Sequence, residues 1–547
     1  MLEFPRLYAS PAQSANDNNM DDEQGITNYK KQFAKEREIR SLSLRRENHH
    51  SSSSFRNSPN FKSLDKSLLS NELNDENEEA GSEPIQSADI CKVLNSNDIA
   101  QISALLSQFH QALISDPNRF PEISNSGDLS ESFNNCLSGG NLPEIVICQI
   151  LNVISLLFPS CPEEIQIKYI DDGLSFALFE TLSAENLQLV HSSINLIMSL
   201  SDSSGYARNS LICLGIHDTL IMIASAGATR DLLTDDGEIT EISQRHEFVP
   251  DPLVDTACSA IHHIFMNPEA IDLDILASCV SPLLPLLNLQ SLVAVNFIIE
   301  TFAEITNKMP SLVSVLYECG LYPLTAQLLP VPGLTCSTLR LVGNLAVGQP
   351  LHVEELINAG VLDVLMMLIT GSSTSQLSEN TTNGFDFDLS NFNGEFIDDA
   401  LWALSNIVES IGTIIIPRFS ESFIMFVLGA SQQLNYSVKK EAAFFIATLV
   451  AIADNAEAVK LIKTVEVSQA VAELLADMLA CGSEAIILRC IDAIRKLLRC
   501  EGVAATNGAF ASALIEEDAQ GRLSDLVEGG SENVAPMARV LLEELNV

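Results

Sequence analysis

"DDALWALSNIVES", residues 398–410, holds the only tryptophan of a 547-residue chain, and similar stretches recur along the sequence. Residues three and four positions apart share one face of an α-helix, so Asp399, Trp402 and Asn406 form a short stripe on that face. Comparable stretches are "STLRLVGNLAVG" at 337–348 and "EAAFFIATLVA" at 441–451. The recurrence predicts a helix that is repeated many times, with this stripe either in the core or on a binding surface.

The spacing of these helices identifies the repeat. Aligning them puts equivalent positions at 148, 195, 259, 302, 340, 402, 444 and 492, and five of the seven spacings fall between 38 and 48 residues. The other two, 64 and 62, contain polar insertions at 229–251 and 371–396, which we assign to loops. Between the helices recur pairs of helical segments joined by glycine, such as "VEELINAGVLDVLMMLI" at 353–369. Three helices per repeat of roughly 42 residues is the armadillo pattern.

We therefore expect an all-α fold, a right-handed α-solenoid of about ten armadillo repeats. A single repeat can bury its apolar face only against its neighbours, so one continuous core should run through the repeats. Residues 1–66, rich in Ser, Asn and Asp, predict a largely disordered tail with a basic segment at 26–47. Residues 67–97 form an acidic linker, and 98–547 form the repeat domain.

Composition narrows the class of function. The apolar runs are shorter than the roughly 18 residues of a membrane helix, and no signal peptide pattern begins the sequence, so we expect an intracellular protein without membrane insertion. The twelve cysteines are scattered singly, which predicts reduced core residues rather than disulfides or a zinc site. His262 and His263 are adjacent and point to different helix faces, so we interpret them as structural. We expect neither metal nor cofactor.

The charge distribution favours basic partners. Residues 24–66 carry ten Lys/Arg and four Asp/Glu, a net +6, so the rest of the chain carries −48 of the total −42. An acidic body of this kind repels nucleic acid and attracts Lys/Arg-rich peptides. Phosphate-binding glycine loops, nucleophile elbows and clustered metal ligands do not occur in the sequence, so we do not expect an enzyme.

In these features the chain resembles the importin alpha family of nuclear import adaptors. The stretches "TLRLVGNLAVG", "DALWALSNI" and "VKKEAAFFIATLVA" between 338 and 451 are similar to successive third helices of that family, and the likeness extends more faintly over 98–547. The basic segment resembles the family's importin-beta-binding tail. The resemblance implies that importin beta contacts Lys30, Lys31, Lys35, Arg37, Arg40, Arg45 and Arg46.

In that family, asparagines hold the backbone of an extended cargo peptide, tryptophans form slots for lysine stems, and carboxylates receive the ammonium groups. Carried over to this sequence, the resemblance implies a minor cargo site at Arg340, Asn344, Asp399, Trp402, Asn406, Glu441, Phe444 and Thr448. Two other interpretations stay open: Trp402 packs between adjacent third helices, and Arg340 neutralises neighbouring acids.

The other half of the groove departs from the family pattern. Its tryptophan and asparagine positions are Cys148/Asn152, Asn195/Ser199, Ser259/His263 and Phe302/Thr306, so Asn152 is the only asparagine retained at an amide position. We expect cargo with Lys/Arg-rich signals to bind mainly at the minor site. The resemblance adds the family's export receptor and nucleoporins as partners, and shuttling between cytoplasm and nucleus. The alternative is an armadillo scaffold of the catenin type that is not engaged in nuclear import.

Overall fold

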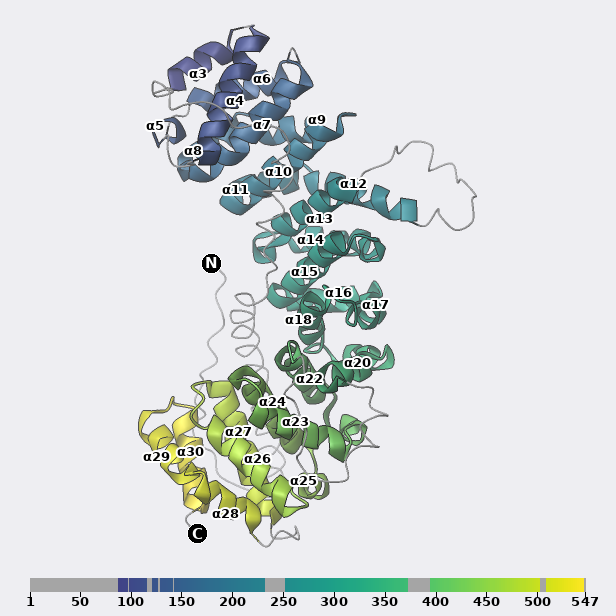
Figure 1. Ribbon diagram of the computed structural model, residues 1–547, viewed down its shortest axis with the longest axis vertical. Coiled ribbons are helices and arrows are strands. Elements are labelled where there is room, and N and C mark those ends of the chain that lie inside the picture. The colour runs from purple at the N-terminus through teal and green to yellow at the C-terminus, as the bar shows by residue number, and fades with distance from the viewer. Residues whose placement is uncertain are drawn as a thin grey trace, which may run out of the picture. The chain divides into compact units, whose positions relative to one another are not determined.

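The computed structural model describes residues 87–545 except 97, 116–120, 126–127, 141, 232–250, 372–393 and 502–507. The regular elements in these residues are α-helices and short 3-10 helices, with no strand among them (Figure 1). The predicted all-α fold is confirmed. The basic segment 26–47, most of the linker 67–97 and most of the two polar insertions lie outside the described residues.

One helix of each repeat packs against its equivalent in the next repeat. We call this series the third-helix row. Its members are α4 (Ile99–Ser115), α7 (Glu144–Leu157), α10 (Leu187–Ser203), α13 (Asp251–Phe265), α15 (Leu292–Lys308), α18 (Thr335–Leu345), α22 (Ile397–Ile411), α24 (Tyr436–Ile452), α27 (Glu484–Glu501) and α30 (Val534–Leu545). The eight positions aligned in the sequence all fall in consecutive members, α7 to α27, so the predicted repeat is confirmed.

The remaining helices complete the repeats; α3 precedes the row, and the others lie between its members along the chain. In the first half they are α3 (Ser87–Leu94), α5 (Pro121–Ser124), α6 (Asp128–Ser138), η2 (Phe158–Ser160), α8 (Glu163–Asp171), α9 (Leu174–Thr181), α11 (Gly205–Cys213), α12 (Ile216–Asp231), η4 (Pro268–Ala270), α14 (Leu273–Leu283) and η5 (Leu284–Asn288). In the second half they are η6 (Pro310–Leu312), α16 (Val313–Glu318), α17 (Leu321–Leu328), α19 (Pro350–Asn358), α20 (Val361–Thr370), η7 (Gly412–Arg418), α23 (Glu421–Gln433), α25 (Asn455–Leu461), α26 (Val465–Met478), α28 (Ala509–Glu516) and α29 (Ala519–Gly529).

Local sequence sets where these helices begin and turn. Asn435 caps α24, its side chain accepting a hydrogen bond from the Val438 N–H at 3.0 Å, and Asn186 caps α10 in the same way. Gly360 separates α19 from α20 with φ of 94°, and Gly320 separates α16 from α17 with φ of 85°. Only glycine adopts this left-handed conformation at low cost, which is why the predicted glycine turns fall at these positions.

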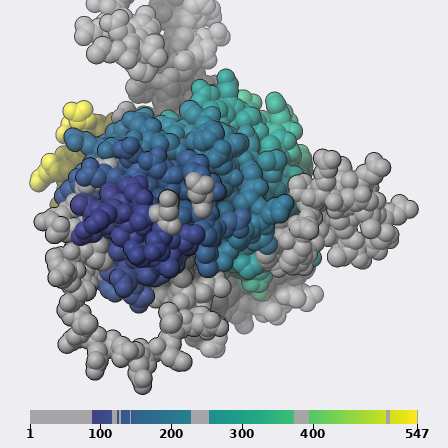
Figure 2. Space-filling view, turned by 90° about the horizontal axis from the view of Figure 1, so that it is seen from above, coloured from purple at the N-terminus to yellow at the C-terminus, as the bar shows by residue number. Residues whose placement is uncertain are grey.

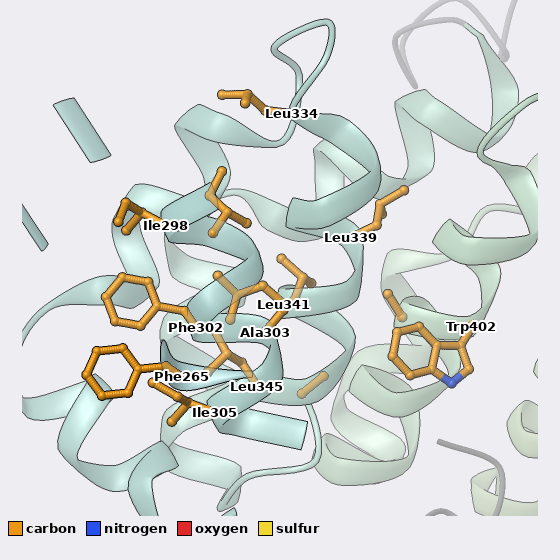
Figure 3. Packing of buried hydrophobic residues seen from close by; sticks show 14 of the residues in the cluster. Phe265, Ile298, Phe302, Ala303, Ile305, Leu334, Leu339, Leu341, Leu345 and Trp402 are labelled. Carbon is orange, nitrogen blue, oxygen red and sulfur yellow. The ribbon is translucent and has the colours of Figure 1, made fainter. Parts of the chain in front are cut away.

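The core is one continuous cluster of buried apolar residues that reaches from Ile90 to Leu541, as the solenoid interpretation predicts. Seen from the N-terminal end, the purple and blue helices of the first repeats lie in front of the teal helices that follow them (Figure 2). Each third helix contributes apolar residues to both neighbours. Figure 3 shows this between α15 and α22, where Phe302, Leu341 and Leu345 lie close together.

Two details differ from the expectations. α3 falls within the predicted linker 67–97 and packs against α4 and α6, so helical structure extends into that segment. Among the cysteines, all twelve are free, but Cys213 is exposed rather than in the core.

The last helix, α30, buries Val534 and Leu541 against the preceding repeat, and Met537 packs on the cluster. Val540 lies on the same helix at similar apolar spacing, but its side chain is 40% exposed.

By length and composition alone, the segment Ile397–Arg418 could cross a membrane, and so could the bent pair Gly205–Cys213 and Ile216–Ala226. Residues Ile397–Arg418 comprise α22 and η7, and 56% of their most apolar window is buried within the protein. α22 packs between α18 and α24 in the third-helix row. Burial on both sides accounts for the apolar composition of α22.

Candidate functional site: the third-helix row from α15 to α27

Trp402 and Asn406 both contact Gly343 of the preceding third helix. A Cβ atom built on Gly343 would lie 1.8 Å from Cζ3 of the indole and 2.2 Å from Cη2, so the ring rests directly on the backbone of α18. Asn406 donates a hydrogen bond from Nδ2 to the Gly343 carbonyl at 3.1 Å. Figure 3 shows the indole turned toward the helix that carries Leu341 and Leu345. Trp402 is 1% exposed, so the structure agrees with the interpretation that it packs between adjacent third helices.

The other amide of the predicted minor site has a similar contact. Asn344 donates from Nδ2 to the Ala303 carbonyl of α15 at 2.9 Å and to Thr306 Oγ1 at 3.3 Å. Donation to the preceding third helix recurs elsewhere on the row: Ser199 donates to the Ser155 carbonyl, and Lys496 donates to the Ala451 carbonyl. These polar side chains hold successive repeats in register, a structural role that sequence comparison had not assigned to them.

Two polar atoms at the amide position accept no hydrogen bond from the described residues. They are Oδ1 of Asn406 and Oγ1 of Thr448, at equivalent positions of α22 and α24. Asn406 is 2% exposed and Thr448 is fully buried. A buried acceptor without a donor costs about 1–3 kcal/mol, so a ligand N–H that reached these atoms would recover that free energy.

Carboxylates gather on the same helices. Asp399 on α22 and Glu441 on α24 are 6% and 2% exposed, and Lys440 lies 4.0 Å from Glu441. On α15, burial raises the pKa of Glu300 and of Glu304, and the nearby Arg340 guanidinium opposes that rise. Arg340 thus sits among acids, in agreement with the interpretation that it neutralises them.

The predicted residues do not all lie together. Arg340, Asn344, Asp399, Trp402, Asn406, Glu441, Phe444 and Thr448 occupy three consecutive helices, α18, α22 and α24, whereas Asn152 lies on α7, four members of the row before α18. Asn152 is half-buried, and the neighbouring position Cys148 is buried. The residues predicted to contact importin beta, Lys30 to Arg46, lie outside the described residues.

The two adjacent histidines have separate partners. His263 Nδ1 lies 2.6 Å from Asp202 Oδ1, and His262 lies 3.8 Å from Glu300. Burial, then the neighbouring His263 and Arg340, lower the pKa of His262 to about 3, so its ring is neutral at pH 7. Groups of three or more His, Cys, Asp or Glu placed to hold a metal are not found in the described part of the chain.

Sequence reasoning missed one ion pair on the row. Arg489 of α27 pairs with Glu409 of α22, and its guanidinium carbon lies 5.7 Å from the centroid of the Phe444 ring on α24. The two charged side chains are 11% and 4% exposed. The alignment places Arg489 at the carboxylate position of its repeat, the position of Asp399 and Glu441, and this change of charge sign was the available signal.

A cavity of about 280 Å³ lies elsewhere. It is enclosed by η7, α23, α24, α25 and the start of α26, and is lined mainly by apolar side chains such as Phe419 and Leu449, with Lys460 and Lys463 among its polar residues. It contains none of the predicted site residues.

No protein-family model matches the chain, and no curated protein matches its sequence. Among solved structures, the crystal structure of an engineered protein is 16% identical and superposes with a TM-score of 0.60 over 84% of this chain and 98% of that chain. Two designed armadillo repeat proteins, the second in complex with the peptide (KR)4, are 20% and 21% identical. Each covers 49% of this chain, with TM-scores of 0.37 and 0.36, and 100% and 99% of its own length is matched.

The fold is an armadillo repeat solenoid. At these levels of identity the likeness concerns the fold alone. A solenoid of this kind presents repeated helical surfaces and is typical of protein-interaction scaffolds.

Proposed function

We propose that this armadillo solenoid is a nuclear import adaptor, which binds an extended Lys/Arg-rich segment of its cargo along α18, α22 and α24. The observation that carries the proposal is the pair of buried acceptors, Asn406 Oδ1 and Thr448 Oγ1, at matching positions of consecutive third helices. An extended peptide offers backbone N–H groups at regular intervals, and the free acceptors are on one row. Their arrangement suits main-chain recognition.

Charge supports a basic rather than an acidic partner. The buried carboxylates Asp399 and Glu441 lie on the same helices as these acceptors, seven residues earlier, and the chain outside residues 24–66 carries −48. A lysine or arginine stem can lie along the Trp402 indole while its charge reaches a carboxylate. Trp402 is 1% exposed, so we expect a local rearrangement of its neighbours when a partner side chain reaches the ring.

The test is a titration of a labelled Lys/Arg-rich peptide against three proteins: the wild type, the double variant Trp402→Ala/Asn406→Ala, and the matched double variant Asn195→Ala/Ser199→Ala. A cation over an indole contributes about 0.5–2 kcal/mol and a hydrogen bond to a charged partner about 1.5–3 kcal/mol, so the first variant should bind roughly tenfold to a thousandfold more weakly. The second variant should bind nearly as tightly as the wild type.

Loss of Trp402 also removes packing on Gly343, so folding must be separated from binding. Circular dichroism of each variant provides that check, and Asn406→Leu, which preserves side-chain volume, tests the amide alone. Equal affinity of all folded variants, or a larger loss at Asn195 and Ser199, would refute the proposed site.

The transport part of the proposal rests on the basic tail, and importin beta is its expected partner. A pull-down with importin beta should recover the full chain but not a chain lacking residues 1–66. Raising the salt concentration should weaken this binding further in variants that already bind weakly, because exposed charge contacts are screened. Binding of basic peptides without any binding of importin beta would instead support an armadillo scaffold outside nuclear import.

A further inference from the structure

We propose that Arg489 acts as an internal substitute for a ligand cation at Phe444, and so ends the basic-peptide site at α24. The inference rests on the proposed function, since it states which basic side chains of a bound peptide contribute to its affinity. It concerns an arginine of α27 that lies outside the residues suggested by family resemblance.

The geometry places Arg489 where a bound lysine or arginine stem would lie. Its guanidinium carbon is 5.7 Å from the Phe444 centroid, within the range of cation–π contacts, and the same group pairs with Glu409. Glu409 belongs to α22 and Arg489 to α27, while Phe444 belongs to α24 between them. The Arg489 side chain therefore extends from α27 past the Phe444 ring of α24 and reaches the Glu409 carboxylate of α22.

The repeat alignment explains how this happens. Phe444 occupies the position that Trp402 occupies one repeat earlier, and Arg489 occupies the position of Asp399 and Glu441. At α22 the aromatic ring has a carboxylate at the preceding position, which attracts a ligand cation. Phe444 has Glu441 at the same preceding position of its own helix, but the next third helix, α27, supplies the cation of Arg489 where α24 supplies the carboxylate of Glu441. The two aromatic positions therefore differ: Trp402 is adjacent to acids, and Phe444 already has a cation.

Displacing Arg489 is unfavourable because both members of its ion pair are buried. Removing one partner from such a pair leaves an uncompensated charge, which is far more costly than losing an exposed pair. A ligand cation at Phe444 would in addition be repelled by the arginine at short range. In a peptide with several basic residues, the basic residues that reach α24 should therefore add little to its affinity.

The test compares two peptides of different reach. An extended chain rises about 3.3 Å per residue and packed helices lie about 8–10 Å apart, so one repeat corresponds to roughly three peptide residues. A (KR)4 peptide can therefore span the Trp402 and Phe444 positions together, whereas the end-capped tripeptide KRK, about 7 Å between its first and last residues, reaches only one of them. In the wild type the affinities for the two peptides should agree within about threefold, after correction for the larger number of registers in which the longer peptide can bind.

Arg489→Met keeps an apolar stem and removes the charge. It should raise the affinity for (KR)4 about tenfold and leave that for the capped tripeptide KRK within about twofold. The matched control is Arg499→Met, because Arg499 lies on the same helix, is 65% exposed and pairs with Glu544, so the charge change is identical but distant from Phe444. The control should change neither affinity by more than about twofold.

Because Glu409 is buried, Arg489→Met could unfold the local repeat. The double variant Glu409→Gln/Arg489→Met removes both charges and should reproduce the gain for (KR)4. Unchanged or weaker (KR)4 binding in the folded variants, or an equal gain in Arg499→Met, would overturn the role of Arg489 while leaving the proposed function intact. Absence of binding of both peptides to every protein, wild type included, would overturn the proposed function and this inference together.

Discussion

The contact between Trp402 and Gly343 predicts that Gly343→Ala lowers the free energy of unfolding in the wild type and raises it when Trp402 is replaced by alanine. Gly343→Ala would place a methyl group 1.8 Å from Cζ3, 2.2 Å from Cη2 and 2.6 Å from Cε3 of the indole. Normal carbon contacts are about 3.5–4 Å, so the ring and its helix must move by roughly 2 Å. The Asn406 hydrogen bond to the Gly343 carbonyl lies in the path of that movement.

The opposing contributions can be compared. Overpacking a core costs about 1–3 kcal/mol, and a strained or lost hydrogen bond about 0.5–1.5 kcal/mol. Against these, replacing glycine with alanine inside a helix stabilises it by about 1 kcal/mol. Gly343→Ala should therefore lower the free energy of unfolding by about 1–3 kcal/mol in the wild type. In the background of Trp402→Ala the clash is absent, and the same substitution should stabilise by about 1 kcal/mol.

Thermal and urea unfolding followed by far-UV circular dichroism measures all four proteins of this cycle. Unfolding of a solenoid need not be two-state, so amide exchange of α18 gives a local reading of the same change. Gly205→Ala is the control, because its added Cβ would lie 3.7 Å from the nearest atom, the guanidinium of Arg208. The reasoning is refuted if Gly343→Ala has the same effect with and without the indole.

Three further outcomes follow from other contacts. Asn344→Ala should destabilise the α15–α18 contact by about 1–3 kcal/mol, measured by urea unfolding, because its amide bonds the Ala303 carbonyl; an unchanged midpoint would contradict that role. Arg495 and Arg499 lower the pKa of Glu544 to about 2, so stability from this cluster should be present above pH 4.5 and lost as pH falls toward 2, and Glu544→Gln should remove that dependence from amide exchange of α30. The ring of His262, whose pKa burial lowers to about 3, should remain neutral at pH 5 in an NMR titration, and its contribution to stability should be lost as pH falls from 6.5 toward 3.

The repeat architecture could be predicted because it depends on local patterns that recur. Apolar periodicity located the third helices, and glycine turns such as Gly320 and Gly360 located the junction between the other two. The start of the helical region was harder to predict from the sequence, since α3 lies in a segment whose average composition is acidic and polar. Val540 follows the same apolar spacing as its neighbours, but the last helix has no further repeat to cover it.

The site was less predictable because its contacts join distant residues. Gly343 stands inside a helix, which signals a close approach, but the sequence does not say that the approaching group is an indole 59 positions later. The alignment displays Arg489 in place of a carboxylate, yet its pairing with Glu409, 80 positions away, depends on the stacking of three helices. The side-chain amide of Asn406 has a donor, Nδ2, and an acceptor, Oδ1. Only the structure shows that Nδ2 is hydrogen-bonded within the protein while Oδ1 accepts no hydrogen bond from the described residues.

The central claim, that a basic peptide is recognised at α22, can be tested with the intrinsic fluorescence of the full chain. Trp402 is the only tryptophan, so every change in indole emission reports on this position. Titration with unlabelled (KR)4 should produce a saturable change in emission whose midpoint equals the dissociation constant obtained independently from anisotropy of a labelled peptide. A labelled peptide that binds with no change in Trp402 emission, or no binding at all, would contradict the account.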